Sequence, residues 1–266
     1  MRIVAIGDPH GNLKKLRKIS FKGIDLILLT GDIGKANLAR KFVFRNIERR
    51  KKGLPKVEET PQQDKAQYAE VYNSSISVLR YLSKFAPVYT IFGNVESHDY
   101  EIAKREKKIG LKLPRFVANI KKIKNVAIIN NRIRSFNGVK IGGLEYFIDT
   151  NWVREFKPSD YKKRLLSAKR ETDKAKKILQ WFHKIDILVC HQPPYGVLDK
   201  VTNHHAPKHW IGKNAGSKVI LTYIKKTQPG YVFCGHIHEG EGKQKIGKTE
   251  VYNLGVASHK IIELEI

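Results

Sequence analysis

Short apolar runs rich in Val and Ile recur along the whole chain, and they limit its fold more than any other feature. Runs of about 4–8 such residues are typical of buried strands. They lie at residues 3–7, 25–31, 88–93, 126–130, 139–147, 186–190, 231–235, 250–255 and 260–266. Helical patterns separate several of them, at residues 12–19, 36–50, 64–85, 99–109, 159–183 and 217–226. Alternating strands and helices predict an α/β fold, with parallel pairing in the first half and mixed sheets overall.

Local patterns refine this expectation without dividing the chain. Asn137 and Gly138 stand between two strand-like runs and predict a tight hairpin turn. Ser217 opens a helical pattern as an N-cap residue does. The polar segment 51–63, which contains two prolines, is expected to be an exposed loop. Since no repeat or low-complexity tract interrupts the sequence, we expect a single domain over residues 1–266.

The chain is strongly basic, because 51 Lys and Arg residues oppose 25 Asp and Glu residues, for a formal net charge of +26. Such an excess favours polyanions or phosphorylated molecules as partners. The basic residues are dispersed along the sequence, whereas a nucleic-acid site forms one stripe in space, so nucleic acid stays open as a partner. No apolar run reaches the roughly 18 residues of a membrane span, and the N-terminal segment is too polar for a signal peptide. We therefore expect no membrane contact and a cytoplasmic location.

Two histidines, His236 and His238, follow the apolar run 231–235. In extended backbone, residues i and i+2 point to the same face, so both imidazoles can converge on one point. Asp8 and His10 repeat this spacing after the first apolar run. An isolated His-x-His pair is more often a pair of surface side chains, so a metal site needs further donors.

Further donors follow the other apolar runs. Five runs end in a small residue, and the next residue in each case can bind a metal ion, namely Asp8, Asp32, Asn94, His191 and His236. Ligands of α/β proteins collect in the crevice beyond the carboxyl ends of the strands, and glycine there allows close backbone approach. The Gly-Asp and Gly-Asn blocks alone could be ordinary turns, and His191 alone could be a partly buried histidine with satisfied hydrogen bonds. Their occurrence at equivalent positions after five strands favours a shared metal site.

This ordered set of blocks resembles the calcineurin-like metallophosphoesterases, whose blocks are D-x-H, G-D, G-N-[HD], a single His and G-H-x-H. The chain shows GDPHG (7–11), GDIG (31–34), GNVE (93–96), CHQPP (190–194) and GHIH (235–238) in that order. The resemblance covers residues 7–238 and implies a four-layer α/β/β/α sandwich of two mixed sheets flanked by helices, with two metal ions at the strand ends. One ion would be held by Asp8, His10, Asp32 and His238. The other would be held by Asp32, Asn94, His191 and His236, with Asp32 bridging the two.

The resemblance further implies a hydrolase of phosphate esters, a phosphodiesterase or a phosphatase, that acts through a metal-bridging hydroxide. Imidazole and oxygen ligands without thiolate favour two divalent transition metal ions from among Mn, Fe, Zn, Co and Ni. Two metals about 3.5–4 Å apart can acidify a bridging water and clamp the attacking and leaving oxygens, so no side-chain nucleophile is needed. A phosphorylated small molecule or a nucleotide is the expected substrate.

The third block departs from the family pattern, because Val95 stands where many relatives have a histidine that protonates the leaving group. His98, three residues later, is one candidate to replace it. His204, with His205 and His209, is another, on a loop expected to rim the metal site; exposed histidines without a catalytic role are the alternative. Without a general acid, poor leaving groups lose an acceleration of about 10²–10⁴-fold. We therefore expect activated esters or diesters to be preferred over alkyl monoesters.

Two other functions stay open from the sequence. The double-strand-break-repair nucleases share these blocks, and the basic charge agrees with a nucleic-acid-processing phosphoesterase, although we see no long extension for a DNA-binding domain. A retromer subunit uses the same fold to bind proteins without catalysis. Such a scaffold usually lacks metal ligands, and here all seven are present.

Overall fold

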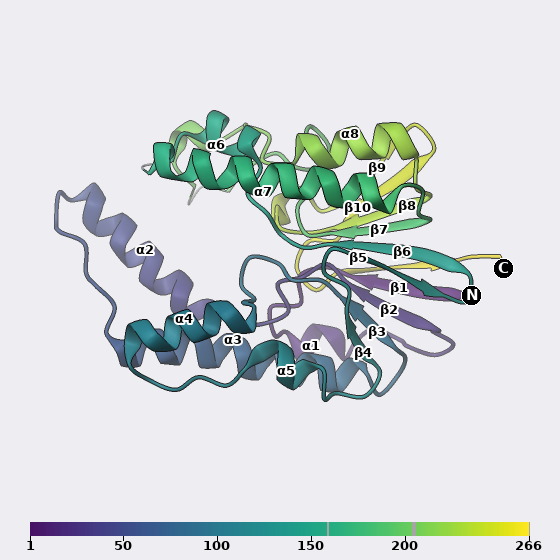
Figure 1. Ribbon diagram of the computed structural model, residues 1–266, viewed down its shortest axis with the longest axis horizontal. Helices are drawn as coiled ribbons and strands as arrows, with labels where there is room; N and C mark the ends of the chain where they lie inside the picture. The colour runs from purple at the N-terminus through teal and green to yellow at the C-terminus, as the bar shows by residue number, and fades with distance from the viewer. Residues whose placement is uncertain (159, 204–205, 266) are drawn as a thin grey trace.

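Two β-sheets packed face to face form the centre of the molecule, and helices cover the outer face of each sheet (Figure 1). The computed structural model describes residues 1–158, 160–203 and 206–265. The layer order is therefore α/β/β/α, which is the four-layer sandwich that the sequence predicted. No helix within these described ranges is long and apolar enough to cross a bilayer.

The first sheet has five strands in the order β11-β1-β2-β3-β4. Neighbouring strands from β1 to β4 are parallel, and β11 joins β1 in antiparallel register. The strands are β1 (Arg2–Ile6), β2 (Leu26–Leu29), β3 (Val88–Thr90), β4 (Val126–Ile128) and β11 (His259–Glu263). The parallel pairing predicted for the first half of the chain is thus confirmed.

The second sheet has six strands in the order β5-β6-β7-β8-β10-β9. Strands β6, β7, β8 and β10 are parallel, and the edge strands β5 and β9 are antiparallel to their neighbours. The strands are β5 (Arg132–Phe136), β6 (Val139–Leu144), β7 (Ile187–Cys190), β8 (Tyr231–Cys234), β9 (Gly242–Ile246) and β10 (Thr249–Asn253). β9 was not predicted, because its sequence GKQKI is mostly polar and exposed at the sheet edge.

The hairpin between β5 and β6 turns at the predicted residues. Asn137 has φ 46° and Gly138 has φ 84°, and positive φ at both central residues is what a type I′ turn requires. The turn pairs Phe136 with Val139. The hairpin prediction is therefore confirmed.

Strand side chains alternate between two hydrophobic cores, as the period of two requires. In β1, Ile3 and Ala5 enter the core between the sheets, whereas Val4 and Ile6 pack under the helices. A strand buried on both faces needs apolar residues at every position. This is why the strands appear in the sequence as continuous apolar runs.

In the part of the chain that the structure describes, five helices lie on the side of the first sheet and three cover the second (Figure 1). The first group is α1 (Leu13–Leu16), α2 (Asn37–Lys51), α3 (Pro61–Leu82), α4 (Asp99–Ile109) and α5 (Phe116–Ile120). The second group is α6 (Thr150–Phe156), α7 (Tyr161–Phe182) and α8 (Lys218–Thr227). Helices α5 and α6 were not predicted, since a helical period is read over about 11–18 residues and these helices are shorter.

Two helix starts show how local residues set the boundaries. Ser217 caps α8 as predicted, because its Oγ accepts hydrogen bonds from the N–H groups of Val219 and Ile220. The prediction of a loop at residues 51–63 is wrong at its C-terminal boundary, because α3 begins at Pro61. Thr60 and the residue three positions later form a capping box there, and proline suits the first helical turn.

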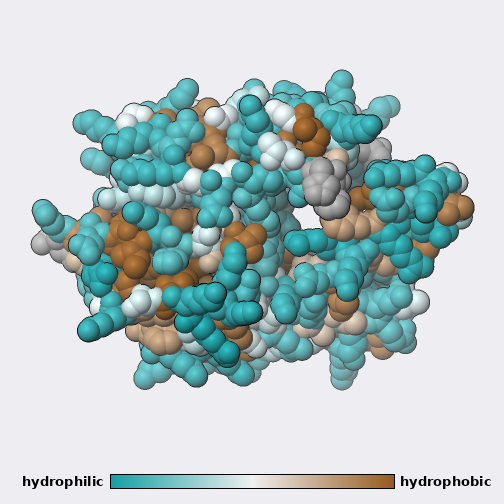
Figure 2. Space-filling model, turned by 180° about the vertical axis from the view of Figure 1, so that it is seen from behind, coloured by the Kyte–Doolittle hydropathy of each residue, from teal (hydrophilic) through white to brown (hydrophobic). Residues whose placement is uncertain are grey.

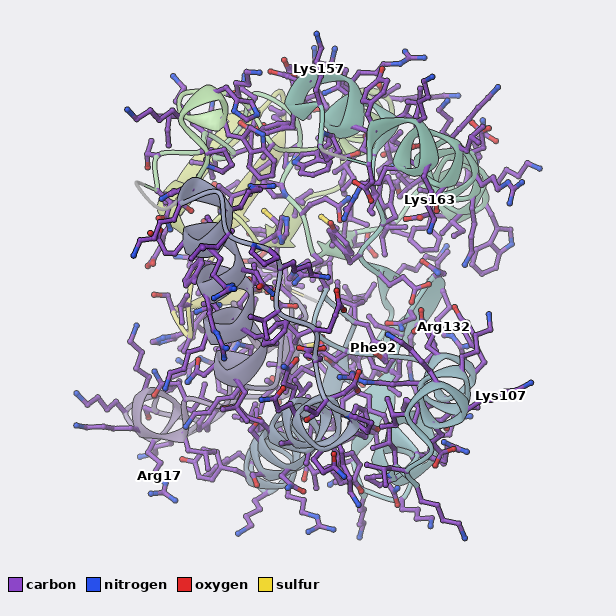
Figure 3. The ribbon with its side chains drawn as sticks, turned by 90° about the vertical axis from the view of Figure 1, so that its left-hand side faces the viewer. Arg17, Phe92, Lys107, Arg132, Lys157 and Lys163 are labelled. Carbon is purple, nitrogen blue, oxygen red and sulfur yellow. The ribbon has the colours of Figure 1, made fainter. Side chains whose placement is uncertain are left out.

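Helix α2 differs from the other long helices, since none of its residues is buried. It projects from the side of α3 and reaches toward α6 (Figure 1), and from that side it rises from the lower layer toward the upper one (Figure 3). Seen from behind, it stands at the right edge of a mostly hydrophilic surface (Figure 2). Leu38, Val43 and Phe44 are exposed on it. We call α2 the arm.

Candidate metal centre

The predicted donor residues follow the carboxyl ends of five parallel strands, three from the first sheet and two from the second. Asp8 and His10 follow β1, Asp32 follows β2, Asn94 follows β3, His191 follows β7, and His236 and His238 follow β8. Phe92, two residues before Asn94, lies in the middle of the molecule between the helical layers (Figure 3). Because ligands of α/β sheets collect beyond these strand ends, the position agrees with the expected site.

Asp8, His10 and His238 form a first group, whose ligand atoms lie within 4.8 Å of one another. Nε2 of His10 is 3.4 Å from Nε2 of His238, and Nε2 of His238 is 3.2 Å from Oδ2 of Asp8. Oδ2 of Asp32 lies 3.8 Å from Nε2 of His10. Two nitrogen ligands of one tetrahedral zinc ion lie roughly 3.4 Å apart, so these separations suit a shared ion.

Asn94, His191 and His236 form a second group beside the first. Oδ1 of Asn94 is 2.9 Å from Nδ1 of His236 and 3.0 Å from Nε2 of His191. Oδ1 of Asp32 lies 3.5 Å from Nε2 of His191. The two carboxylate oxygens of Asp32 therefore face different groups, Oδ2 toward the first and Oδ1 toward the second.

Backbone carbonyls orient two of the imidazole rings. Nδ1 of His191 is 2.9 Å from the carbonyl oxygen of Thr30, and Nδ1 of His10 is 3.4 Å from that of Gly34. A carbonyl oxygen only accepts hydrogen bonds, so Nδ1 donates in both rings and Nε2 is the nitrogen that faces the cluster. The Thr30 hydroxyl also donates to Oδ1 of Asp8 at 2.8 Å. Both rings thus direct Nε2 toward the other donors.

The protonation states of the buried donors suit a metal ion. Asp8 and His191 are fully buried. Burial alone would raise the pKa of Asp8, but the charge of His191 and the interactions with His238 outweigh it and hold the pKa at about 2. Burial and the charge of His191 lower the pKa of His236 to about 3. Asp8 is therefore anionic and His236 neutral at pH 7, which are the metal-binding forms.

Three donor residues have backbone conformations that residues other than glycine rarely adopt. His10, Asp32 and His236 have φ of 42°, 44° and 66°, in the left-handed region where strain concentrates at functional sites. The glycine before the last of them is also constrained, because a Cβ on Gly235 would overlap the carboxylate of Asp8. The close approach that glycine was expected to allow is present at this strand end.

Glu96 is a buried carboxylate to which the sequence analysis assigned no role. It accepts hydrogen bonds from the backbone N–H groups of residues 32–34 and of Gly93, at 2.7–3.4 Å. Burial and the charge of Asp32 raise its pKa to about 7. Glu96 thereby fastens the loop after β2 to the loop after β3. Its place in the GNVE block, two residues after Asn94, was the available indication.

Tyr146 is a second residue that the sequence analysis missed. Its ring centroid is 5.6 Å from that of His191 and 5.2 Å from that of His236. Burial raises its pKa to about 12, so the phenol stays neutral. Nothing in the linear sequence distinguished this tyrosine, because the run 139–147 has the pattern of a strand.

Neither Val95 nor His98 takes the place of the histidine that protonates the leaving group in many relatives. The backbone N–H of Val95 donates to Oδ1 of Asp32 at 3.1 Å, and its side chain has no proton to give. His98 hydrogen-bonds through Nε2 to Glu145 at 2.7 Å, and its ring packs on Tyr100. The hydrogen bond to Glu145 raises the pKa of His98 and outweighs the effect of burial. The imidazole is thus held by a carboxylate.

The other candidate histidines lie after the HQPP block. His204 and its neighbour His205 are outside the described residues. His209 is exposed on the short 3₁₀ turn η1 (Lys208–Trp210), with its ring against Trp210. Within the described ranges, no hydrogen bond or ring contact joins His209 to the two donor groups.

An α/β/β/α sandwich with oxygen and imidazole donors at its strand ends defines the class of metallophosphoesterases. Residues 1–240 match the model of the calcineurin-like phosphoesterase family. The chain belongs to this family and is a phosphoester hydrolase by class.

The chain is also similar to solved structures, the first of which shares its fold. One crystal structure has a TM-score of 0.57 at 15% identity, and the match covers 98% of this chain and 94% of that chain. A dimetal phosphatase from Danio rerio has a TM-score of 0.49 at 9% identity, with coverage of 97% and 88%. TT1561 of Thermus thermophilus has a TM-score of 0.44 at 16% identity, with coverage of 97% and 90%. No curated protein sequence matches the chain at a significant level.

Proposed function

We propose that the protein is a binuclear-metal-dependent hydrolase of phosphate esters, either a phosphodiesterase or a phosphatase. The observation that carries this proposal is the position of Asp32. Its Oδ2 faces His10 of the first group and its Oδ1 faces His191 of the second. A carboxylate between two sets of donors is suited to bridge two ions, as in two-metal hydrolases.

The donors present fit such a centre. Asp8, His10, Asp32 and His238 would hold one ion, and Asp32, Asn94, His191 and His236 the other. No thiolate takes part, because Cys190 and Cys234 lie in the hydrophobic core under α7 and α8. Imidazole with carboxylate and amide oxygen favours Mn, Fe, Zn, Co or Ni. Two such ions when bound activate water and offset the charge of the phosphoryl group.

The residues of the chain orient this chemistry. The carbonyl groups of Thr30 and Gly34 fix two imidazoles, and Glu96 fixes the loop of Asp32. Val95 supplies no proton to a leaving group, and the ring of His98 is held by Glu145. We therefore propose a preference for diesters and activated esters over alkyl monoesters.

Turnover of three substrates tests this preference. With Mn or Ni added, bis-p-nitrophenyl phosphate and p-nitrophenyl phosphate should be hydrolysed faster than an alkyl monoester, by about 10²-fold or more. His98→Gln should leave the rate on the aryl diester nearly unchanged. Equal rates on the alkyl monoester, or a hundredfold loss in His98→Gln, would contradict the assignment.

Asp32→Asn tests the metal centre itself. The change removes the bridging charge, and we expect both bound metal and activity to fall by at least about 100-fold. Elemental analysis of the purified protein measures the metal. Asp173→Asn on α7 is the matched control, since its exposed carboxylate pairs only with Lys176 among the described residues. A variant Asp32→Asn that keeps two ions would refute the proposal.

A nucleic-acid substrate is a second candidate, favoured by the net charge of +26. Labelled basic side chains such as Arg17, Lys107 and Lys157 lie on widely separated parts of the surface (Figure 3). A nuclease should bind DNA with a steep dependence on salt and cleave it. Absence of both salt-dependent retention and cleavage would exclude this candidate.

A further inference from the structure

A cavity of about 460 Å³ adjoins the metal centre, and two of the donor residues, Asn94 and His236, form part of its wall. This volume lies within the usual range of small-molecule sites, about 300–1,000 Å³. Most of the remaining wall is apolar and rich in aromatic side chains. We call it the aromatic cavity; its aromatic residues are Phe44, Tyr146, Phe147, Trp152, Phe156 and Trp210.

Three of these aromatic side chains hold one another in place. The Trp152 ring stacks on Phe156 with centroids 5.3 Å apart and planes at 14°. Trp210 packs edge-on against both rings, and its Nε1 donates to the carbonyl oxygen of Phe156 at 3.0 Å. Flat, preorganised aromatic walls favour a planar ring as ligand, because stacking adds to the burial of apolar area. Phe156 is fully buried, whereas Trp152 and Trp210 keep exposed surface.

A buried hydrogen-bond acceptor lies in the same wall. Gln192 is 4% exposed, and its Nε2 donates to the carbonyl oxygen of Phe147 at 2.7 Å. This bond fixes which end of the amide is the oxygen. Oε1 of Gln192 has no hydrogen-bond partner within the described part of the chain. Buried acceptors are nearly always paired, and a ligand with an N–H donor that reaches Oε1 from the cavity would pair this one.

The arm contributes to the wall of the aromatic cavity. Phe44 and Ile47 of α2 belong to the wall, although no residue of the arm is buried. The arm rises across this side of the molecule, between the lower and upper layers (Figure 3). An exposed helix that gives two apolar side chains to a cavity beside the metal centre has a place in substrate binding.

We propose that the aromatic cavity binds a nucleobase of the substrate, a planar ring with an N–H donor at its edge, while the attached phosphoryl group lies at Asn94 and His236. This inference rests on the proposed function and names its substrate class as nucleotides or nucleoside phosphodiesters. The aromatic walls select the planar ring, and Gln192 selects the donor. An acyl chain would leave the acceptor unpaired, and a simple sugar has no planar ring to stack on the aromatic walls.

Binding of phosphonates tests the proposal without turnover, because a C–P bond resists hydrolysis. Calorimetry on the Mn-supplemented protein compares the 5′-phosphonates of adenosine, of purine riboside (which lacks the amino group) and of ribose. The adenosine compound should bind roughly 10–100-fold more tightly than the ribose compound, as base stacking on aromatic side chains predicts. The purine riboside compound should fall between them. Equal affinity for adenosine and ribose phosphonates would overturn the proposal.

Two variants on the arm locate the effect. Phe44→Ala removes an aromatic wall residue and should reduce the adenosine-over-ribose ratio several-fold. Val43→Ala is the matched control, because Val43 is 53% exposed on the same helix and does not line the cavity. If both variants behave alike, the base binds elsewhere and the proposal fails.

Gln192→Leu distinguishes the contribution of ring stacking from that of the hydrogen bond donated by the base. The variant should bind the adenosine and purine riboside phosphonates equally, while elemental analysis shows the metal retained. A preserved difference between these two ligands would remove the role of Gln192. Failure of the proposed function gives another pattern, namely no hydrolysis of any phosphoester and phosphonate binding that does not depend on Mn.

Discussion

The metal centre and the aromatic cavity share a wall but are built in different ways. Donor side chains of the centre follow strand ends and are held by backbone groups, as His191 is by the carbonyl of Thr30. Cavity side chains come from helices, loops and the exposed arm, and they hold mainly one another, as Trp152 and Phe156 do. In the proposed function, the sheets therefore position the metal ligands, whereas the peripheral elements line the cavity in which the rest of the substrate would bind.

The largest effect is expected from Gly235→Ala, a variant that tests how tightly the strand ends are packed. Gly235→Ala places a Cβ on the carboxylate of Asp8, so we expect bound metal and activity to fall by about 100-fold or more. Gly230→Ala is the control, because its Cβ would only touch the carbonyl oxygen of Asp186 at 3.5 Å. Metal analysis and turnover measure both. Full metal content in Gly235→Ala would show that the centre tolerates rearrangement.

Glu96→Gln is expected to have the next largest effect. The carboxylate accepts hydrogen bonds from four backbone N–H groups around Asp32, and an amide would turn a donor toward some of them. Metal affinity should fall about 10–100-fold, as for other outer partners of metal ligands. Metal titration followed by calorimetry measures this. Glu263→Gln, at an exposed carboxylate, should change nothing; equal affinities in both variants would refute the role of Glu96.

Glu145→Gln should show a smaller effect that depends on pH. The hydrogen bond to Glu145 raises the pKa of His98 above 6.5. Burial would raise the pKa of Glu145, but the interactions with His98 outweigh burial and lower this pKa below 4.5. The stabilisation through His98 is lost as pH rises through its raised pKa, and that through Glu145 is lost as pH falls through its lowered pKa. The variant should therefore lose about 1 kcal/mol of unfolding free energy between these limits and less outside them.

Urea unfolding at a series of pH values measures this loss. Glu58→Gln serves as the control, because that carboxylate is highly exposed and pairs with Lys56 on the surface. A loss in Glu145→Gln that is constant from pH 4 to pH 9 would show that the charged pair is not its source.

The smallest expected effect concerns the arm. Phe44→Ala should change the unfolding free energy by no more than about 0.5 kcal/mol, since the side chain is 40% exposed. Its metal content should equal that of the unchanged protein. Loss of metal in Phe44→Ala, measured beside Gly235→Ala, would mean that the cavity and the centre are not the separate regions described above.

Much of the fold and of the candidate site could be predicted from the sequence. Buried strands appear as continuous apolar runs, and the donors, such as Asp32 and His191, come directly after them. Short elements were missed for a local reason, since α5 is too short for a helical period and β9 is a polar edge strand. The role of Glu96 depends on N–H groups from two loops, which no local pattern displays.

The sequence by itself determined the strands and the residues that follow the strand ends, because these properties depend on neighbouring residues in the chain. It also indicated the class of protein, because five short blocks occur in a fixed order along the chain. Only the tertiary structure decided which oxygen of Asp32 faces which group, that His98 is held by Glu145, and that Phe44 and Trp210 share one cavity wall. The physical reason is distance along the chain. An aromatic residue in a core and one in a binding cavity have the same local sequence pattern, and packing alone distinguishes them.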